Sequence, residues 1–257
     1  MTFTIGADVE VFAKNKDGHH VSLCGLIGGT KEKPKQLDNF PLGFCVQEDN
    51  VSLEWNIPAT SRRNSFIDSI YAINLAVNHI VKTLDLQVSD HVAVSFDKQE
   101  LTHPNALVFG CEPDYDAWKL IENSKPQCND VTLRTAGGHI HVGTDRDMVE
   151  VIRNMDLLLG VPSVILDTSP GSAKRRELYG KAGAMRPKPY GCEYRVLSNY
   201  WTKSHDLITW VYNQTRLATE FKHNFTKEVR DSIINCINTG DKQIAGHLIE
   251  TFGIKLP

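Results

Sequence analysis

The chain has 257 residues and a formal net charge of −3, with 41% hydrophobic and 23% charged residues. These values are typical of a globular protein, and the slight negative charge argues against a nucleic-acid binder held by bulk electrostatics. No apolar run approaches the roughly 18 residues that a membrane-spanning helix needs, so no membrane partner is expected. In the absence of an internal repeat or a Pro/Ser-rich linker, we expect residues 1–257 to form a single domain.

The cysteines and the N-terminal residues indicate the compartment. The 6 cysteines are scattered without a C-x-x-C pair, a spacing that fits neither a structural zinc site nor a disulfide-dense secreted module. The first residues lack the basic and apolar regions of a signal peptide. We therefore expect reduced thiols and a cytoplasmic protein.

The first predicted strand carries two carboxylates on one face. Residues 3–12 alternate between apolar and polar side chains, which predicts a strand with one buried face. Asp8 and Glu10 share the polar face, and at about 7 Å per two residues both can reach one cation or two neighbouring cations. Such oxygen ligands suit Mg²⁺ or Mn²⁺. An exposed sheet face with scattered charge is the alternative.

A second predicted strand, residues 45–58, places Glu54 and Asn56 on a polar face and ends at Pro58. Between the two strands, a turn at residues 15–18 and a strand near residues 20–26 form a hairpin-like segment. Residues 28–31, Gly-Gly-Thr-Lys, lack the spacing of a P-loop and are interpreted as a plain loop.

Helical and extended segments follow in the middle of the chain. Apolar residues recur at helical spacing from residue 65 to residue 84, with Ser65 and Asp68 resembling a capping box. Residues 88–96 are predicted to form a strand. We expect residues 103–118 to be a loop in which Asp114 caps a short helix.

Two more helical regions are expected. Asp145 is predicted to cap a helix that ends at Gly160. Residues 201–252 are predicted to be helical, with Gly240 ending one of their helices. The simplest interpretation is that these helices pack against the sheet.

The most distinctive stretch is Gly-Gly-His-Ile-His-Val-Gly at residues 137–143. In a strand, His139 and His141 point to one face while Ile140 and Val142 enter a core on the other. The flanking glycines allow another backbone or a phosphate to come close. A strand with two incidental histidines is the alternative.

Residues 174–195 are rich in basic side chains, with seven lysines and arginines among glycines and prolines. The guanidinium fork of arginine suits bidentate binding of phosphate or carboxylate. The interleaved Gly and Pro favour a shaped loop, and a solvated basic loop is the alternative. In the strand predicted for residues 192–197, Glu193 and Arg195 share a face.

Together these strands predict one site. If they are neighbours, their carboxylates and imidazoles line one concave surface, where four negative charges would repel by several kcal/mol at an intermediate dielectric. Divalent cations remove that penalty, and the arginines can offset the roughly four further charges of ATP. The residues therefore indicate a metal–nucleotide site without a P-loop.

The order of these motifs resembles the glutamine synthetase superfamily and, within it, the phage-encoded carboxylate–amine (COOH–NH2) ligases of type 2. The shared elements are G-x-[DE]-x-E at residues 6–10, Glu54, G-G-H-x-H-x-G at residues 137–143, and Y-G-K-A-G through E-Y-R and S-N-x-W at residues 179–201. The resemblance implies an α+β fold, a curved antiparallel sheet with helices packed on its outer face. It also implies a location in the host cytoplasm if the gene is carried by a phage.

The resemblance implies roles for individual residues. Asp8, His139 and Glu193 would hold a Mg²⁺ or Mn²⁺ ion that bridges the nucleotide phosphates, and Glu10 with Glu54 would hold another. Asp8 stands where the family commonly has Glu, which shortens the reach by one methylene.

The residues implied to contact ATP or the reacting groups come from several segments. The implied ATP ligands are Arg175, Arg176, Lys181, Arg195 and His141. The implied catalytic residues are Arg195 and Arg186 at the transferring phosphoryl group, His141 near it, and Glu54 as a candidate base.

The function implied is ATP-dependent joining of a carboxylate to an amine through an acyl phosphate. An ATP-dependent phosphotransferase on the same fold and a non-catalytic nucleotide- or metal-binding module are the alternatives. The sequence leaves the acid and the amine open among small molecules, peptide termini and a modified nucleobase, and it leaves the oligomeric state open.

Overall fold

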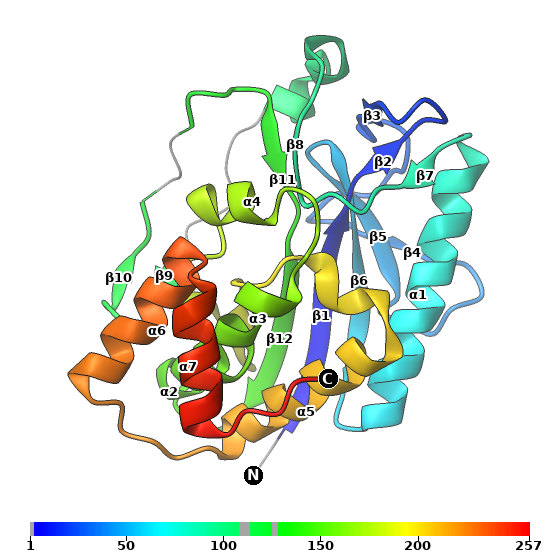
Figure 1. Cartoon of the computed structure of the whole chain (residues 1–257). Helices are drawn as coiled ribbons and strands as arrows, with labels where there is room; N and C mark the ends of the chain where they lie inside the picture. Colours follow the sequence, from blue (N-terminus) through cyan, green and yellow to red (C-terminus); the bar gives the residue numbers. More distant parts are fainter. Residues whose placement is uncertain (1–2, 108–113, 125–127) are drawn as a thin grey trace.

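The computed structural model describes residues 3–107, 114–124 and 128–257 (Figure 1). Its central element is a 9-stranded sheet in which all neighbouring strands are antiparallel. In spatial order the strands are β10 (Ile121–Glu122), β9 (Tyr115–Asp116), β13 (Ala184–Lys188), β14 (Gly191–Tyr194), β12 (Gly138–Thr144), β1 (Phe3–Val11), β6 (Ser52–Thr60), β5 (Cys45–Asp49) and β4 (Lys35–Gln36). This open sheet confirms the predicted α+β fold.

Two small sheets lie at one end of the large one. One has 3 strands in the order β3 (His20–Val21), β2 (Ala13–Lys14) and β7 (Gln87–Val88). The other pairs β11 (Leu133–Thr135) with β8 (Ala93–Ser95). The strand predicted near residues 20–26 therefore exists but is only two residues long.

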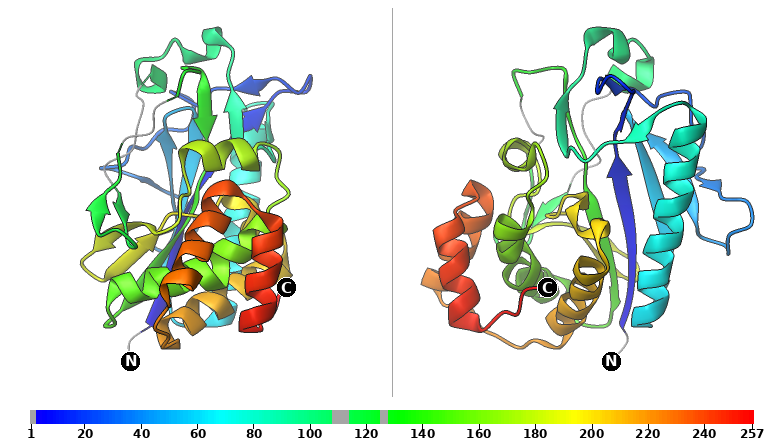
Figure 2. Two further views of the ribbon diagram at one scale, coloured as in Figure 1. Left: turned by 60° about the vertical axis from the view of Figure 1, so that its left-hand side comes forward. Right: turned by 45° about the vertical axis from the view of Figure 1, so that its right-hand side comes forward.

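The helices gather on one side of the large sheet (Figures 1 and 2). They are α1 (Arg63–Thr83), α2 (Met148–Met155), the π-helical turn η3 (Asp156–Gly160), α3 (Val161–Leu166), α4 (Ser172–Leu178), α5 (His205–Glu220), α6 (Lys227–Thr239) and α7 (Lys242–Phe252). Short 3₁₀ turns are η1 (Lys98–Leu101) and η2 (Pro104–Leu107), which lie beyond one end of the large sheet, and η4 (Asn199–Lys203). Helices α1, α2 and α5 contact β6, β14 and β1 respectively. No helix in the described residues has the length and apolar content needed to cross a membrane.

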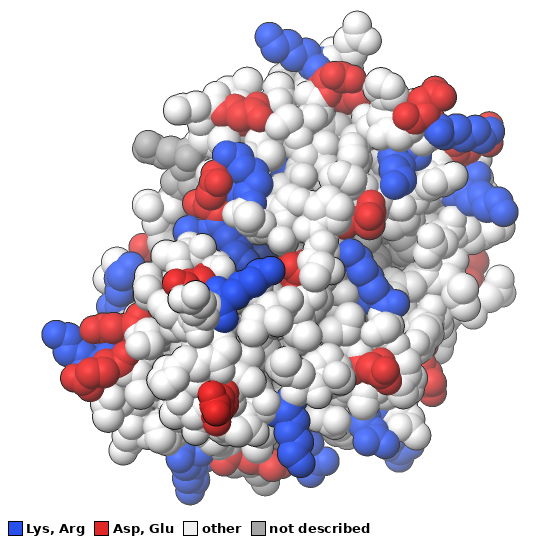
Figure 3. Space-filling model, viewed as in Figure 1, with Lys and Arg blue, Asp and Glu red and all other residues white. Residues whose placement is uncertain are grey.

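The alternation of the central strands explains this one-sided cover. In β1, Ile5 and Val9 are fully buried on the helix side, as are Ile140 and Val142 in β12. The intervening polar residues point to the other face. The sheet therefore has an apolar face under the helices and a polar face that carries the predicted site residues. On the face shown in Figure 3, basic and acidic side chains are interspersed, in keeping with the small net charge.

The single strand predicted for residues 45–58 is wrong, because this segment is the hairpin β5–β6. The chain turns at Asn50, which has a left-handed φ of 55°, a conformation that asparagine tolerates better than most residues. Pro58 does not end the second strand, which continues to Thr60 past an irregularity in the β1–β6 register.

Two further local predictions are wrong because the segments pair with distant parts of the chain. Residues 88–96 are divided between β7 and β8, and between them the N–H of Val92 donates to the carbonyl of Pro170. Asp114 caps no helix, because Tyr115 and Asp116 form β9 against β13. Residues 111–113, which belong to the predicted loop, lie outside the described residues.

The helix starts are shifted by two residues. Helix α1 begins at Arg63 rather than Ser65, directly after a turn in which the Thr60 hydroxyl accepts the N–H of Arg62. The cap of α2 is Asp147 rather than Asp145, and its carboxylate accepts the N–H of Glu150 at 2.9 Å.

The glycine at residue 160 does not end a helix, since the chain continues through η3 into α3. A Cβ at Gly160 would lie 2.7 Å from both Ile237 Cδ1 and the Tyr194 hydroxyl, so this glycine permits close packing. The prediction for Gly240 is confirmed, because it ends α6 with a φ of 72°.

Candidate active site

The four strands predicted to carry polar side chains are adjacent, in the order β14-β12-β1-β6. Their register places Asp8 opposite His139, His141 opposite Glu193, and Glu10 opposite Glu54. Side chains that face each other across antiparallel strands have Cβ atoms about 4.5–5.5 Å apart. The sheet therefore brings all five predicted metal ligands to one polar face.

Glycines on β12 allow this arrangement. A Cβ at Gly137 would lie 2.3 Å from His139 Nε2, and one at Gly138 would lie 2.5 Å from the Ser198 carbonyl. Either contact would displace the strand or the imidazole. The glycines predicted to permit close approach therefore make room for the site itself.

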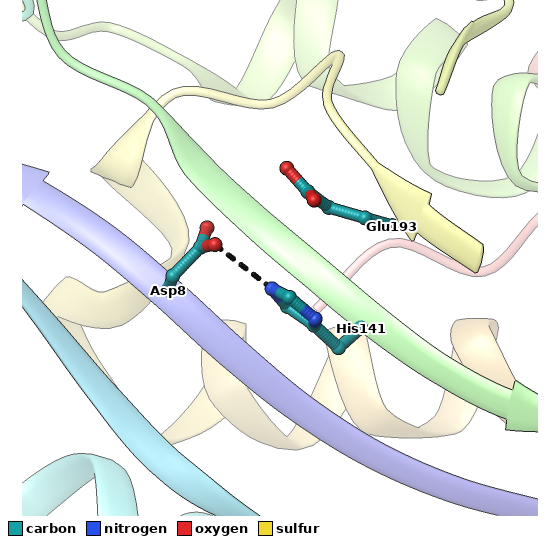
Figure 4. Close-up of side chains that lie close together, drawn as sticks. All are labelled: Asp8, His141 and Glu193. Atoms are coloured by element: carbon teal, nitrogen blue, oxygen red, sulfur yellow. Dashed lines mark hydrogen bonds and ion pairs between the residues drawn. The ribbon is translucent and has the colours of Figure 1, made fainter. Parts of the chain in front are cut away.

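The first group of candidate ligands is Asp8, His139, His141 and Glu193, which we call the Asp8 cluster. Figure 4 shows three of its members, Asp8, His141 and Glu193. Asp8, His141 and Glu193 each offer a ligand atom, and these atoms lie within 4.8 Å of one another. The carboxylate of Asp8 lies 2.8 Å from His139 Nδ1 and 2.9 Å from His141 Nε2. The structure thus places His141 as close to the candidate ligands as His139.

The protonation states of this cluster are set by mutual charge. Burial alone would raise the pKa of Asp8, but His139 and His141 outweigh it and hold the pKa well below the usual value. Burial and Arg195 lower the pKa of His139, which keeps this imidazole neutral. A neutral imidazole can coordinate a metal ion.

Glu193 is fully buried and forms ion pairs with three basic side chains. Lys188 Nζ lies 3.0 Å and Arg186 3.2 Å from its carboxylate, and Arg195 is paired with it as well. Burial raises the pKa of Glu193, but Arg195 and the other neighbouring positive groups outweigh it and lower the pKa to about 2. Two of the predicted phosphate-binding arginines are therefore held at the Asp8 cluster.

The second group is Glu10, Asp49 and Glu54, which we call the Glu10 cluster. Its ligand atoms also lie within 4.8 Å of one another. Burial, and secondarily Asp49, raises the pKa of Glu10 to about 8. Burial, and secondarily Asp8, raises the pKa of Glu54 well above its usual value. Both carboxyls therefore bind a proton more tightly than an exposed glutamate does, and a divalent cation would compete with that proton.

The sequence did not single out Asp49. It lies at the end of β5, and the β5–β6 hairpin carries it back toward Glu54. The available signal was the run Glu-Asp-Asn at residues 48–50, an acidic turn between two apolar–polar alternating segments.

Asp114 is a second residue that sequence analysis placed differently. Its carboxylate lies 3.5 Å from Arg195 Nε and lines the same cavity as Arg195. The predicted helix cap is instead a neighbour of the site. Tyr190 is a third addition, because its hydroxyl is hydrogen-bonded to His141 Nδ1.

A cavity of about 370 Å³ opens beside the two clusters. Glu10, His139 and Arg195 form its wall on the sheet, and Asp49 and Arg134 belong to its further lining. Binding cavities for small molecules are typically about 300–1,000 Å³. This cavity therefore has the size of a small-molecule site in direct contact with both clusters.

Arg175 lines this cavity, but its side-chain nitrogens are hydrogen-bonded to backbone carbonyls. Its side chain is buried, and its nitrogens donate to the carbonyls of Ala136, Val196 and Leu197 at 2.8–2.9 Å. These bonds fix the segments on either side of the site. Burial lowers its pKa to about 10, so it remains charged.

Arg176 and Lys181 are not brought to the clusters. Arg176 is buried and donates to the carbonyl of Ser163 in α3 at 3.0 Å. Lys181 Nζ lies 3.5 Å from the carbonyl of Asn238 in α6. The predicted shaped loop is in fact helix α4 and strand β13, which direct these cations toward the helical layer.

The clusters have the donor chemistry of a divalent-cation site. The two clusters contain five carboxylates, those of Asp8, Glu10, Asp49, Glu54 and Glu193. Three basic side chains, all paired with Glu193, offset part of this negative charge. Carboxylate oxygens with one or two imidazoles suit Mg²⁺ or Mn²⁺. The residues present therefore fit the metal that the sequence predicted.

Comparison with protein families supports the resemblance stated from the motifs. Residues 129–241 match the family described as "Phage phiEco32-like COOH.NH2 ligase-type 2". The match includes β12 and β14, with His139, His141 and Glu193, whereas β1 and β6 precede it. Over this segment the chain is similar to the family that the motifs resemble. No curated protein matches the chain.

Solved structures share the fold. The crystal structure of a bifunctional glutathione synthetase from Pasteurella multocida matches 98% of this chain, with a TM-score of 0.53 and 9% sequence identity. The chain spans 46% of that protein's length. At this identity the likeness concerns the fold alone. The ligand-free structure of GmaS aligns with 100% of this chain over 70% of the GmaS chain. Its TM-score of 0.39 and sequence identity of 10% are too low to support a conclusion.

Proposed function

We propose that this chain is an ATP-dependent carboxylate–amine ligase that forms an amide through an acyl phosphate. The observation that carries the proposal is the register that sets Asp8 opposite His139 and His141 opposite Glu193. The family match over residues 129–241 supports the same reaction class. We further propose that residues 1–257 act as one catalytic domain. In its C-terminal part α5 contacts β1, whereas α6 and α7, which were expected to pack against the sheet, pack on α3.

Each cluster would hold a divalent cation, Mg²⁺ or Mn²⁺. Asp8, Glu193 and one or both imidazoles would bind it in the Asp8 cluster, and Glu10, Asp49 and Glu54 in the Glu10 cluster. Such cations, when bound, neutralise phosphate charge and polarise phosphoryl oxygens. His141 is the Asp8-cluster member with a raised pKa, because Asp8 outweighs the effect of burial. Its Nδ1 would donate a hydrogen bond to a phosphate oxygen in place of its contact with the Tyr190 hydroxyl.

Activation of the carboxylate is the first chemical step. An oxygen of the substrate carboxylate forms a bond to the γ-phosphorus of ATP, and the bond from that phosphorus to the bridging oxygen breaks to release ADP. Arg186 and Arg195, already held at the polar face by Glu193, would donate to the oxygens of the transferring phosphoryl group.

Amide formation is the second step. The amine nitrogen attacks the acyl carbon, and the bond from that carbon to the phosphate oxygen breaks to release inorganic phosphate. The amine proton passes to a base, for which Glu54 is the candidate. Its pKa lies well above the usual value because of burial, so its ionised form is a stronger base than an exposed glutamate.

The acid and the amine would bind in the 370 Å³ cavity, which adjoins both clusters. Their chemical class is a small-molecule or peptide carboxylate and a small-molecule or peptide amine. We place the reaction in the cytoplasm, where thiols stay reduced. Cys24, Cys45, Cys128, Cys192 and Cys236 are all free.

The test is an assay of products after incubation with ATP, Mg²⁺ and a mixed pool of amino acids and polyamines. Mass spectrometry should detect an amide together with ADP and released phosphate in equal amounts. A stable phosphorylated compound without phosphate release would identify a phosphotransferase instead.

Variants identify the site responsible. Glu193→Gln and His139→Ala should abolish product formation, whereas Glu250→Gln, on the exposed side of α7, should not. Undiminished turnover in both site variants would contradict the proposal.

A further inference from the structure

A second cavity lies on the helical side of the molecule. It has a volume of about 670 Å³ and is bounded by α2, the segment between α5 and α6, and Trp118. It shares no lining residue with the cavity beside the clusters. A ligand bound here would therefore not compete directly with the substrates of the proposed ligase.

The charge of this cavity is opposite to that of the whole chain. Arg146, Arg153, Lys222 and Arg230 line it, against the single carboxylate of Glu150. Glu150 pairs with Arg146 at 3.0 Å, and the nearest carboxylate of Arg230 is Asp231 at 3.8 Å. The cavity lining therefore has a surplus of three positive charges, although the whole chain has a net charge of −3. Such a local surplus favours the binding of an anion.

Arg153 is held in place at the cavity wall. Its Nε donates to the carbonyl of Ala117 at 2.9 Å, and its guanidinium carbon lies 5.3 Å from the centroid of the Trp118 ring. The indole N–H of Trp118 in turn donates to buried Asp156 at 2.6 Å. Within the described residues, no carboxylate lies within ion-pair distance of Arg153. The guanidinium group of Arg153 is thus held in place, and no carboxylate of the described residues neutralises its charge.

Aromatic rings form the other part of the wall. Phe225 lies 5.7 Å from Trp118 and 5.0 Å from His223, measured between ring centroids. His223 also stacks on Phe221 with an interplanar angle of 29°. Contiguous rings of this kind offer apolar faces to a planar heterocycle.

We propose that this cavity binds a nucleoside phosphate, with the base against the aromatic rings and the phosphate at Arg153, Lys222 and Arg230. The volume falls within the range of about 300–1,000 Å³ that is typical of small-molecule sites. Arginine forks with an adjoining lysine suit phosphate oxygens. The inference uses no residue of the Asp8 or Glu10 clusters and is independent of the proposed function.

The test is direct binding of AMP by calorimetry in the presence of EDTA, which keeps divalent cations from the clusters. We expect saturable binding to the wild-type chain. Ribose 5-phosphate, which lacks the base, and adenosine, which lacks the phosphate, should each bind at least about tenfold more weakly. Binding of ribose 5-phosphate or inorganic phosphate as tight as that of AMP would overturn the proposal.

Variants locate the binding. Arg153→Gln with Arg230→Gln should weaken AMP binding by at least about tenfold, because charge-assisted contacts are lost. Lys222→Gln, an exposed change in the connecting segment, should weaken it with the fold intact. Arg216→Gln, on the exposed side of α5 outside the cavity, and Arg186→Gln, in the candidate active site, should leave it unchanged. Unaltered binding in the double variant and in Lys222→Gln, or a loss in Arg186→Gln, would overturn the proposal.

Discussion

The two ligand clusters on the polar face differ in how their charge is balanced. In the Asp8 cluster, burial would raise the pKa values of Asp8 and Glu193, but the neighbouring imidazoles and arginines outweigh it and lower both. In the Glu10 cluster, Glu10 and Glu54 have raised pKa values because they are buried beside other carboxylates. Asp8 and Glu10, two residues apart on β1, thus have pKa values shifted in opposite directions.

This difference shows what each half of the site requires. Asp8 and Glu193 have lowered pKa values, and Glu193 is already paired with the basic side chains that would contact a phosphoryl group. Glu10 and Glu54 have raised pKa values, so a divalent cation must compete with protons for them. We therefore expect the first cluster to govern turnover and stability, and the second to govern the pH dependence of cation binding.

Glu193→Gln should have the largest effect. Removing the carboxylate leaves Arg186 and Arg195 without their buried partner, a change that typically costs roughly 3–5 kcal/mol of unfolding free energy. Turnover should fall by about 10²–10³-fold or more. Urea unfolding and phosphate release measure the two effects. Glu177→Gln, which breaks the exposed pair with Lys174, should leave the free energy of unfolding nearly unchanged. Equal destabilisation by the two variants would contradict the contrast between buried and exposed pairs.

Glu10→Gln should change how stability depends on pH. Because the folded pKa of Glu10 is raised to about 8, its contribution is fully present below its unfolded pKa near 4.5 and is lost as pH rises through about 8. In EDTA, the wild-type free energy of unfolding should therefore fall across this window by at most about 1.4 kcal/mol per pH unit from this group. Glu10→Gln should flatten that slope. A variant that follows the wild-type curve would show that Glu10 is ionised in the metal-free protein.

Mg²⁺ stabilisation should increase with pH. Each proton displaced from the Glu10 cluster weakens cation binding by about tenfold per pH unit below the group's pKa. The shift in melting temperature at fixed Mg²⁺ should thus be larger at pH 8.5 than at pH 6.5. Glu54→Gln should reduce both the shift and its pH dependence, whereas Asp8→Asn should reduce only the shift. A shift that is independent of pH in the wild type would contradict the protonated state of this cluster.

Asp49→Asn should have the smallest effect. Asp49 is exposed, so its loss removes one oxygen ligand without unfolding its surroundings. Cation affinity should fall by about tenfold or less, with stability in EDTA nearly unchanged. Calorimetric titration with Mn²⁺ measures this, and Asp38→Asn, in the loop before β5, is the matched exposed control. An affinity equal to that of the control would remove Asp49 from the ligand set.

Much of this arrangement was predictable because strand alternation is local. Asp8 and Glu10 on one strand, and His139 and His141 on another, share a face as soon as each segment is extended. The neighbouring positions of the strands could not be derived from alternation and came from the order of motifs. The sheet order then confirmed that the polar faces coincide.

The features that the sequence did not reveal depend on long-range contacts. Asp49 was missed because the turn at Asn50 contains no glycine, and only the hairpin register brings Asp49 beside Glu54. Arg175 and Arg176 were predicted to contact phosphate because charge was the visible signal. Their burial against backbone carbonyls depends on α4, which the prolines and glycines nearby did not suggest.

The most direct test of the central claim is a count of bound Mn²⁺ by electron paramagnetic resonance in the presence of a non-hydrolysable ATP analogue. The two clusters predict two tightly bound ions per chain in the wild type, one in Glu54→Gln and one in Glu193→Gln, with each variant folded by circular dichroism. A wild-type chain that binds no Mn²⁺ tightly, or variants that bind as many ions as the wild type, would contradict the account.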